Sequence, residues 1–314
     1  MKIACIGNAV YDCLAYRNGF IKEDLRNDFS ESLFSAGGPA LNAASVIAKY
    51  GGDVDFYGRI GNDINGKNII KILKDSNINI DNLKITDNIK TPFSFIIINS
   101  LNNTRTICTI KSNQDNNPFI NIKPNNNYDF ILTDGKYPND TINLIKHNPN
   151  AITIIDAGRV RPGVINLCKI VDYIICSEDF ANELTNLTIN DDINNNSIIF
   201  YQLKNMFKNA KGIVITVGKN GYIYERDGQI FNNKVYKTNE PTIDTNGAGD
   251  IFHGAFTYAF SSNYDFYQSL EFANITASLS TTKRGGRDSC PELEEVESIL
   301  NEKTNVKKLI KSKD

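Results

Sequence analysis

The decisive stretch reads Asp244-Thr245-Asn246-Gly247-Ala248-Gly249-Asp250, and an apolar run from Ile251 to Phe260 follows it. The run predicts a buried helix that begins at this stretch. Gly247 and Gly249 allow turn conformations that a Cβ atom would disfavour, so the amides of residues 247–249 are free to point at one place. A helix N-terminus adds unpaired N–H groups and a partial positive charge. The stretch therefore predicts a site for a phosphate group.

Asp250 is the residue here that does not suit a bound phosphate, because its carboxylate would repel the anion. Its presence is explained if it accepts the proton of a hydroxyl group while the amides hold the phosphoryl group that this hydroxyl attacks. We expect the helix amides to favour the ionised form of Asp250 at neutral pH. The alternative is an ordinary glycine turn and a capped helix, in which Asp250 only interacts with the helix dipole.

Size and composition set the class of protein. The chain has 314 residues, of which 41% are hydrophobic, and this suits one α/β domain over residues 1–314. A net charge of −2 argues against nucleic acid or an anionic membrane as a partner. Six cysteines without a C-x-x-C spacing indicate free thiols in a reduced cytoplasm, and two histidines argue against a histidine-based metal site. We find no apolar run long enough to span a membrane, and no signal peptide.

The seven-residue stretch resembles the signature D-T-x-G-A-G-D of the ribokinase-like (PfkB) carbohydrate kinases, with Asn246 at the variable position. The resemblance implies a three-layer α/β/α fold with a mostly parallel central sheet and a small β lid. It also implies ATP and Mg²⁺ as cofactors, and leaves a monovalent cation open. In this family Asp250 would be the general base, and the amides of Gly247, Ala248 and Gly249 would form an anion hole.

The N-terminal part carries the residues that suit a sugar. A strand over residues 2–7 is followed by Asp12, which we place in a loop at the end of that strand. Gly37 and Gly38 then precede a helix that runs to residue 50 and holds Asn42 in its first turn. Bare glycines let a ligand approach the backbone, and Asp and Asn bond hydroxyl groups. The resemblance implies that these four residues line the sugar site, although Asp12 alone could simply be a turn residue.

The middle of the chain repeats apolar runs at residues 53–58, 128–133, 151–155, 171–176 and 212–217. Segments with helical potential separate most of them, which predicts parallel strands covered by helices. Residues 92–111 instead alternate around a polar turn and predict a hairpin, which with residues 13–36 would form the lid. Arg105 lies just beyond the hairpin tip, either as a substrate contact or as a solvated charge that protects an edge strand. Residues 113–127 read as a surface connection.

The nucleotide side is predicted from Thr216, Gly218 and Gly221, which resemble the family's T-x-G-x-x-G turn. A hairpin that needs glycines is the alternative explanation of this turn. Asn274 lies in a later helix, residues 266–281, that resembles the helix on the adenine side of the family's site.

The metal site departs from the family pattern. Many members carry N-x-x-E after the strand that ends near residue 176, and this chain has Ser177-Glu178-Asp179-Phe180. Glu178 is the candidate that could compensate for the missing carboxylate. The same segment, together with Gly286-Arg287 before Pro291, resembles the ketohexokinase- and sulfofructose-kinase-like members more than ribokinase, and this favours a ketose.

The resemblance thus implies an ATP-dependent kinase that phosphorylates a primary hydroxyl of a sugar, with sugar and ATP as its small-molecule partners. A nucleoside kinase of the same fold and a non-catalytic nucleotide or sugar sensor are the alternatives. The lid would close over the sugar or pair with the lid of a second subunit in a homodimer.

Overall fold

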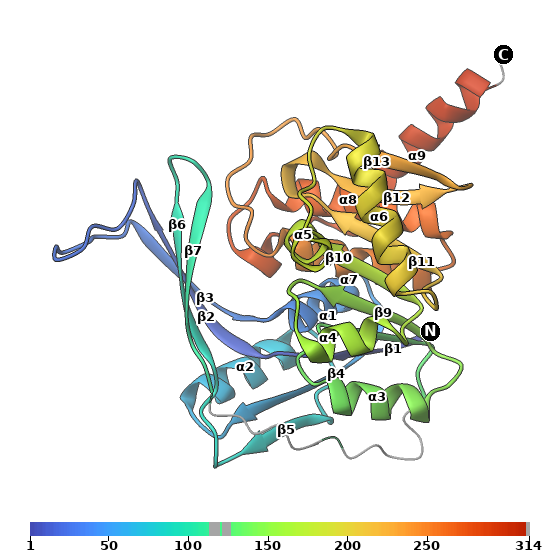
Figure 1. Ribbon diagram of the computed structural model, residues 1–314. Coiled ribbons are helices and arrows are strands. Elements are labelled where there is room, and N and C mark those ends of the chain that lie inside the picture. Colours follow the sequence, from blue (N-terminus) through green and yellow to red (C-terminus); the bar gives the residue numbers. More distant parts are fainter. Residues whose placement is uncertain (113–119, 121–126, 312–314) are drawn as a thin grey trace.

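The computed structural model describes residues 1–112, 120 and 127–311, and its centre is a nine-stranded sheet (Figure 1). From one edge to the other the strands are β13 (Gln229–Asn233), β12 (Tyr222–Arg226), β11 (Gly212–Thr216), β10 (Tyr173–Ser177), β9 (Ile152–Ala157), β8 (Phe130–Thr133), β1 (Lys2–Ile6), β4 (Asp53–Gly61) and β5 (Leu83–Thr86). The strands from β11 to β5 run parallel, and β12 and β13 are antiparallel. The carboxyl ends of the parallel strands therefore meet at one edge, where open α/β sheets bind ligands.

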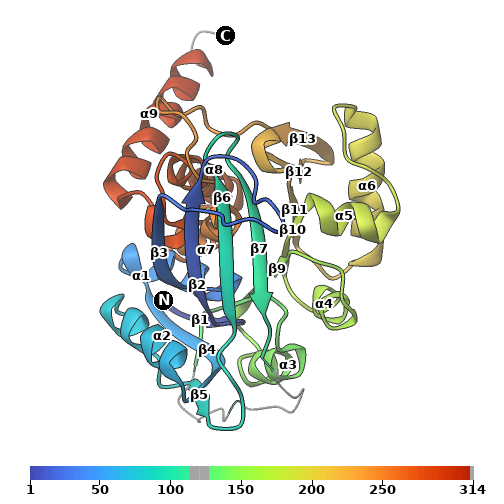
Figure 2. The same cartoon turned by 90° about the vertical axis from the view of Figure 1, so that its left-hand side faces the viewer.

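Helices cover both faces of this sheet (Figure 2). On one face lie α1 (Pro39–Lys49), α2 (Ile64–Asp75), α7 (Ala248–Ser261), α8 (Phe266–Ser280) and α9 (Leu293–Lys311). On the other lie α3 (Pro138–His147), α4 (Pro162–Cys168), α5 (Glu178–Thr185) and α6 (Ile193–Met206). Two short 3₁₀ turns, η1 (Gly218–Asn220) and η2 (Gly286–Ser289), follow β11 and α8.

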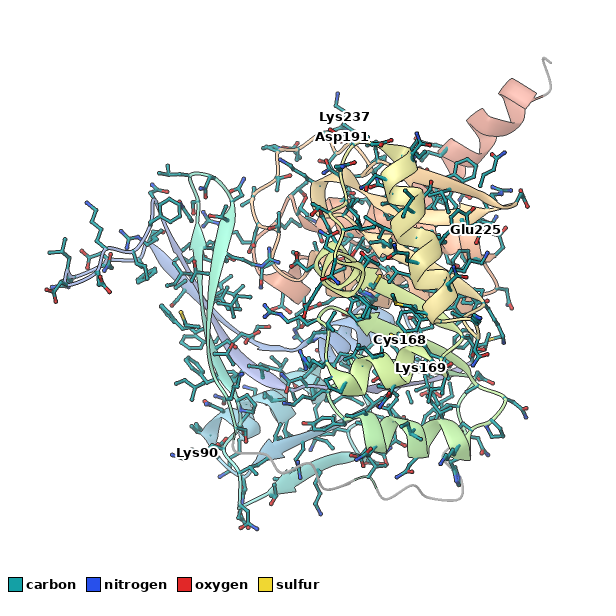
Figure 3. The ribbon with its side chains drawn as sticks, viewed as in Figure 1. Lys90, Cys168, Lys169, Asp191, Glu225 and Lys237 are labelled. Atoms are coloured by element: carbon teal, nitrogen blue, oxygen red, sulfur yellow. The ribbon has the colours of Figure 1, made fainter. Side chains whose placement is uncertain are left out.

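The strands are buried on both faces, which explains their continuous apolar runs. Ile3, Cys5 and Ile6 of β1 have no exposed surface, and neither do Ile154 and Ile155 of β9. Side chains fill the space between sheet and helices. Cys168 at the end of α4 is fully buried, whereas the next residue, Lys169, is exposed (Figure 3). Among the described residues, no helix combines the length and apolar character that a membrane span requires.

A second, four-stranded sheet stands beside the first and faces the viewer in Figure 2. Its order is β3 (Glu31–Gly37), β2 (Val10–Arg17), β6 (Phe93–Asn99) and β7 (Thr104–Ile110). One of its faces packs Leu14, Tyr16, Ile96 and Ile98 together. The three-layer α/β/α arrangement with a mostly parallel sheet and a small second sheet confirms the predicted fold.

The structure differs from the sequence-based prediction at Asp12. The prediction that Asp12 lies in a loop is wrong: Asp12 is within β2, in register with Ser35 of β3 and Ser94 of β6. Strand β2 begins at Val10, only a few residues after β1, so the first residues after the first strand already belong to the small sheet. The predicted surface connection at 113–127 lies almost wholly outside the described residues.

Candidate active site

The glycine stretch forms the N-terminus of α7. Gly247 is the N-cap residue with φ 74°, a conformation that favours glycine, and a Cβ atom there would lie 3.3 Å from the backbone of Gly286. The amides of Gly247, Gly249 and Asp250 have no hydrogen-bond partner among the residues that the structure describes. The Ala248 amide lies 3.4 Å from the Thr245 carbonyl oxygen, a long contact. The site therefore offers a set of donors around the first turn of α7.

Asp244 fixes the start of this stretch through the hydrogen bonds of its carboxylate. Its carboxylate is buried and accepts hydrogen bonds from the Tyr16 hydroxyl at 2.8 Å and from the Asn246 amide at 2.8 Å. The Gly285 amide lies at 3.4 Å from the same carboxylate. Tyr16 belongs to β2, so the small sheet is bonded directly to the start of the glycine stretch.

Asp250 lies in the first turn of α7, and its Oδ2 accepts a hydrogen bond of 2.6 Å from Nδ2 of Asn42 on α1. Burial raises the pKa of Asp250 to about 7, with a further increase from Asp156 and a decrease from the Asn42 hydrogen bond. We expected the helix amides to favour the ionised form of this carboxyl, and desolvation and the Asp156 carboxylate oppose that effect and raise the pKa. A pKa near neutrality suits a general base.

Asp12 and the glycine pair are packed against each other. A Cβ atom on Gly37 would lie 1.9 Å from Oδ2 of Asp12, so the missing side chain makes room for that carboxylate. Gly38 has φ 112°, and a Cβ atom there would lie 2.2 Å from the Asn8 carbonyl oxygen. Burial raises the pKa of Asp12 to about 7, the Ser94 hydroxyl lowers it, and Asp250 raises it.

Two buried amide oxygens are available to accept hydrogen bonds from a ligand. Oδ1 of Asn42 and Oδ1 of Asn8 have no hydrogen-bond partner among the described residues. Such groups are costly to bury unpaired, and a ligand hydroxyl would satisfy them. The nearby Asp134 carboxylate, in contrast, is occupied by the backbone amides of Asn8 and Lys136 at 2.8 and 2.9 Å. The structure thus brings Asp12, Gly37, Gly38, Asn42 and Asp250 into one place.

Arg105 contacts the start of the glycine stretch. Its Nη1 donates to Oγ1 of Thr245 at 3.1 Å, and Asn103 at the same hairpin tip donates to the Thr242 carbonyl oxygen at 2.7 Å. The guanidinium is exposed. The hairpin tip therefore reaches the segment that leads into the glycine stretch.

The residues predicted for the nucleotide lie at the end of β11. Thr216 ends that strand, Gly218 is the first residue of η1 with φ 53°, and Gly221 follows η1 with φ 101°. A Cβ atom on Gly221 would lie 1.8 Å from the Asn233 carbonyl oxygen, so this glycine is required by the turn itself. Asn274 is buried, donates to the Lys234 carbonyl oxygen at 3.1 Å and accepts from the Tyr236 amide at 3.3 Å. Its side chain thus holds the segment after β13.

The segment in place of N-x-x-E forms a helix cap. Ser177 is the N-cap residue of α5, and its Oγ accepts from the Phe180 amide at 3.1 Å. Glu178 is the first residue of α5, at the carboxyl end of β10. Burial raises the pKa of Glu178, and Asp179 raises it further. No group of three or more His, Cys, Asp or Glu side chains suited to a metal occurs within the described parts of the chain.

Sequence reasoning left four contributors without a role. Tyr16 gave no signal because its partner Asp244 is far away in the chain. Asp134 and Asp156 follow or end apolar runs, which was the only hint of their position at this edge. His253 is buried on α7 one turn after Gly249, and its apolar neighbours in the sequence hid it.

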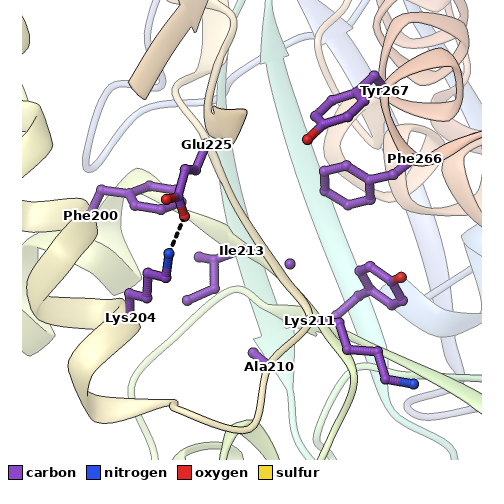
Figure 4. A pocket seen from close by; sticks show the side chains of 10 residues that line it. Phe200, Lys204, Ala210, Lys211, Ile213, Glu225, Phe266 and Tyr267 are labelled. Atoms are coloured by element: carbon purple, nitrogen blue, oxygen red, sulfur yellow. Dashed lines mark hydrogen bonds and ion pairs between the residues drawn. The ribbon is translucent and has the colours of Figure 1, made fainter. Parts of the chain in front are cut away.

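A cavity lies away from this site. It has a volume of about 210 Å³ and is lined by Tyr173, Lys211 and Gly212, where β10 and β11 begin, together with residues of α6 and α8 (Figure 4). Lys204 and Glu225 form an ion pair at its wall, 2.5 Å apart. The amino ends of the strands meet there, so this cavity is separate from the site of Asp250.

Comparisons with known proteins agree with this geometry. Residues 1–293 match the pfkB family carbohydrate kinases. The chain is 26% identical to a ribokinase of Dictyostelium discoideum, over 94% of this chain and 99% of the relative. It is 23% identical to fructokinase-2 of Oryza sativa subsp. japonica, over 93% and 89%. The solved structure of Arabidopsis thaliana ribokinase complexed with ribose and ATP superposes with a TM-score of 0.80 at 22% identity, over 95% of this chain and 98% of that one. The chain therefore belongs to the pfkB family of carbohydrate kinases and is an ATP-dependent sugar phosphotransferase.

Proposed function

We propose that this kinase phosphorylates a primary hydroxyl of a ketose, with Asp250 as the general base. The observation that carries the proposal is the 2.6 Å hydrogen bond between Asn42 and Asp250, which joins the acceptor side of the site to the first turn of α7. A hydroxyl bound by Asn42 would lie next to the carboxylate that removes its proton and next to the amides that hold the phosphoryl group.

The transfer step follows from this arrangement. Asp250 takes the proton of the acceptor hydroxyl, whose oxygen forms a bond to the γ-phosphorus of ATP as the bond from that phosphorus to the bridging oxygen breaks. ADP leaves with the electron pair of the broken bond. The amides of Gly247, Ala248 and Gly249 stabilise the charge on the phosphoryl oxygens, and the Asp250 amide adds a fourth donor. Orientation of the two substrates contributes the rest of the acceleration.

The acceptor would be held by Asp12 and Asn42, beside the glycine pair Gly37 and Gly38 against which the Asp12 carboxylate packs. The unpaired Oδ1 atoms of Asn8 and Asn42 support hydroxyl groups as the ligands. A ketose is supported by the Ser177–Phe180 segment, by Gly286-Arg287, and by the fructokinase among the relatives. Arg105, bonded to Thr245, is placed to contact the acceptor or the phosphoryl group from the small sheet.

On the nucleotide side, Thr216, Gly218 and Gly221 would line the phosphates and ribose, and Asn274 would fix the segment beside the base. A bound Mg²⁺ would neutralise the charge of the ATP phosphates. Glu178, at the start of α5, offers one carboxylate to this ion. One carboxylate can suffice, because Mg²⁺ commonly keeps several waters and binds one or two carboxylates plus phosphates. Whether turnover also requires a monovalent cation would be tested by leaving such cations out of the assay.

The small sheet would act as the lid of a single domain. Its contacts Tyr16–Asp244, Arg105–Thr245 and Asn103–Thr242 support closure over the acceptor. Its edge strand β7 is exposed along its whole length, which supports pairing with the lid of a second subunit.

The test is Asp250→Asn, assayed with ATP and a panel of ketoses, aldoses and nucleosides. We expect kcat to fall by a factor on the order of 10²–10⁴, because a positioned base is lost, while both substrates bind with similar affinity. Ser262→Ala, at the other end of α7, is the control for substitution in this helix. Full turnover in Asp250→Asn would end the mechanism, and preference for a nucleoside would end the ketose assignment.

A further inference from the structure

His253 lies at the base of the catalytic turn with both ring nitrogens against oxygen atoms. Its Nδ1 is 2.7 Å from the Gly249 carbonyl oxygen, and its Nε2 is 3.1 Å from the Ile175 carbonyl oxygen. The Asp156 carboxylate of β9 lies 3.6 Å from the same Nε2. The imidazole is 4% exposed, so water cannot replace these contacts.

The chemistry of the ring decides what these contacts mean. Carbonyl oxygens only accept hydrogen bonds, and a neutral imidazole carries one N–H donor and one lone pair. One tautomer or the other would therefore place a lone pair against a carbonyl oxygen. An imidazolium donates at both nitrogens, satisfies both carbonyls, and forms an ion pair with Asp156.

The Gly249 carbonyl links this ring to the reaction. That carbonyl and the Asp250 amide belong to the same peptide unit, and in a planar trans peptide they point in opposite directions. A hydrogen bond that holds the carbonyl toward His253 therefore holds the Asp250 N–H away from it, toward the phosphate side of the turn. A protonated ring would also bring a positive charge close to the Asp156 carboxylate of this edge.

We propose that His253, as an imidazolium paired with Asp156, is a positioning residue for phosphoryl transfer: it orients the 249–250 peptide and electrostatically stabilises the ionised Asp250 carboxylate. The charged groups that face it are Asp156 from β9 and Asp250 from α7, with Asp134 after β8 also acting on Asp250. From β10 the Ile175 carbonyl oxygen, an uncharged group, contacts the ring. The proposal rests on Asp250 being the base.

The proposed charges of His253 and Asp156 predict opposite shifts in the pKa of Asp250. Loss of the His253 charge raises the pKa of Asp250, because the neighbouring carboxylates are then no longer offset. Loss of the Asp156 charge lowers it. The acid limb of the kcat/KM profile should therefore move up by about one pH unit in His253→Asn, roughly a tenfold loss of activity on that limb. It should move down in Asp156→Asn.

The experiment is the pH profile of kcat/KM for wild type, His253→Asn, Asp156→Asn and the double variant. Asn at 253 places an amide nitrogen close to the position of Nδ1, so the contact with Gly249 survives and the charge does not. The double variant should return the limb to within a few tenths of a pH unit of wild type, because the two charges are removed together. A purely structural role would lower activity equally at all pH values and would not be rescued by the second substitution.

The chain supplies a matched control, because it has two histidines and His147 is exposed on α3. His147→Asn should keep the wild-type profile, and it leaves His253 as the only imidazole for ¹⁵N NMR. We expect both ring nitrogens to show bound protons at pH 7, and this readout needs no activity and no folded His253 variant. A neutral tautomer in that spectrum, or an unmoved acid limb in His253→Asn, overturns the proposal. An active Asp250→Asn enzyme would instead overturn the proposed function.

Discussion

The two glycine segments of the site differ in what occupies the space of their missing side chains. At Gly37 and Gly38 that space is filled by the protein: the Asp12 carboxylate and the Asn8 carbonyl oxygen lie 1.9 and 2.2 Å from the Cβ positions. At Gly249 a Cβ atom would meet no atom of another described part of the chain within 4 Å. The glycines at 37 and 38 thus let the fold assemble, whereas packing gives no reason for a glycine at 249, which agrees with the proposed ligand site there.

Glycine in a binding motif can therefore have either of two separate causes. A glycine that is needed for packing should cost stability when replaced, and a glycine that is needed for a ligand should cost only activity. Gly247 belongs to the first kind, because it has φ 74° and packs on η2. The variants below test the distinction, beginning with the largest expected effect.

Gly38→Ala should be the most damaging change to the fold. The new Cβ atom would collide with the Asn8 backbone, and φ 112° is unfavourable for alanine, so we expect a loss of roughly 3 kcal/mol in the free energy of unfolding. Gly51→Ala is the control, since Gly51 has φ 82° and, apart from its chain neighbours, no described atom lies within 4 Å of its Cβ position, so the variant carries the conformational cost alone. Equal losses in the two variants would contradict the packing role of Gly38.

Gly249→Ala should lower activity without lowering the stability of the fold. Alanine is the better helix former, so the melting temperature should stay the same or rise slightly. The methyl group would intrude on the phosphoryl site, and we expect kcat to fall by a factor on the order of 10². Gly254→Ala on the same helix is the contrast, because its Cβ atom would lie 2.6 Å from the Ala43 carbonyl oxygen and should cost stability. A fully active Gly249→Ala enzyme would show that this space is not used.

The raised pKa values of Asp12 and Asp250 should give activity and stability different dependences on pH. Asp12 on the acceptor side and Asp250 on the phosphate side both have a pKa raised by burial to about 7. Because Asp250 must be ionised to act as base, kcat/KM should fall about tenfold per pH unit below that value. In kinetic profiles, an acid limb that stays unchanged in Asp12→Asn and is lost in Asp250→Asn would identify the base.

The same two carboxyl groups act on stability with the opposite sign. Between their unfolded value and about pH 7 the folded protein binds more protons than the unfolded chain, so they make the ligand-free enzyme more stable as the pH falls through 7. Asp250→Asn should therefore melt at a higher temperature than wild type at pH 8, and the difference should shrink by pH 5. A variant less stable than wild type at pH 8 would mean that the ionised carboxylate is well solvated.

Glu178→Gln should have the smallest effect. If the phosphate side relies on metal carried with ATP, the variant should need only a few-fold more Mg²⁺ and reach nearly the wild-type kcat at saturation. Asp179→Asn, at the exposed neighbouring position, is the control. Loss of turnover at saturating Mg²⁺ would make Glu178 a direct participant.

The sequence alone was sufficient for much of the fold. Buried parallel strands must be apolar on both faces, so β1, β8, β9, β10 and β11 appear as uninterrupted runs. The start of α7 was also readable, because the glycines, Asp250 and the apolar residues that follow are neighbours in the chain. Local chemistry of this kind needs no knowledge of distant segments.

Tertiary structure decided the rest, because electrostatics and close packing depend on residues that are remote in the chain. The glycine pair at 37 and 38 looked like a ligand cradle, and only the fold shows that Asp12 and Asn8 fill it. In the sequence, Asp250 looked like a carboxylate whose ionised form is stabilised by helix amides. In the fold, burial and the Asp156 carboxylate raise its pKa. His253 looked like part of an apolar helix, and the Ile175 carbonyl and Asp156, about 80 to 100 residues away in the sequence, give it two oxygen contacts that no local pattern contains.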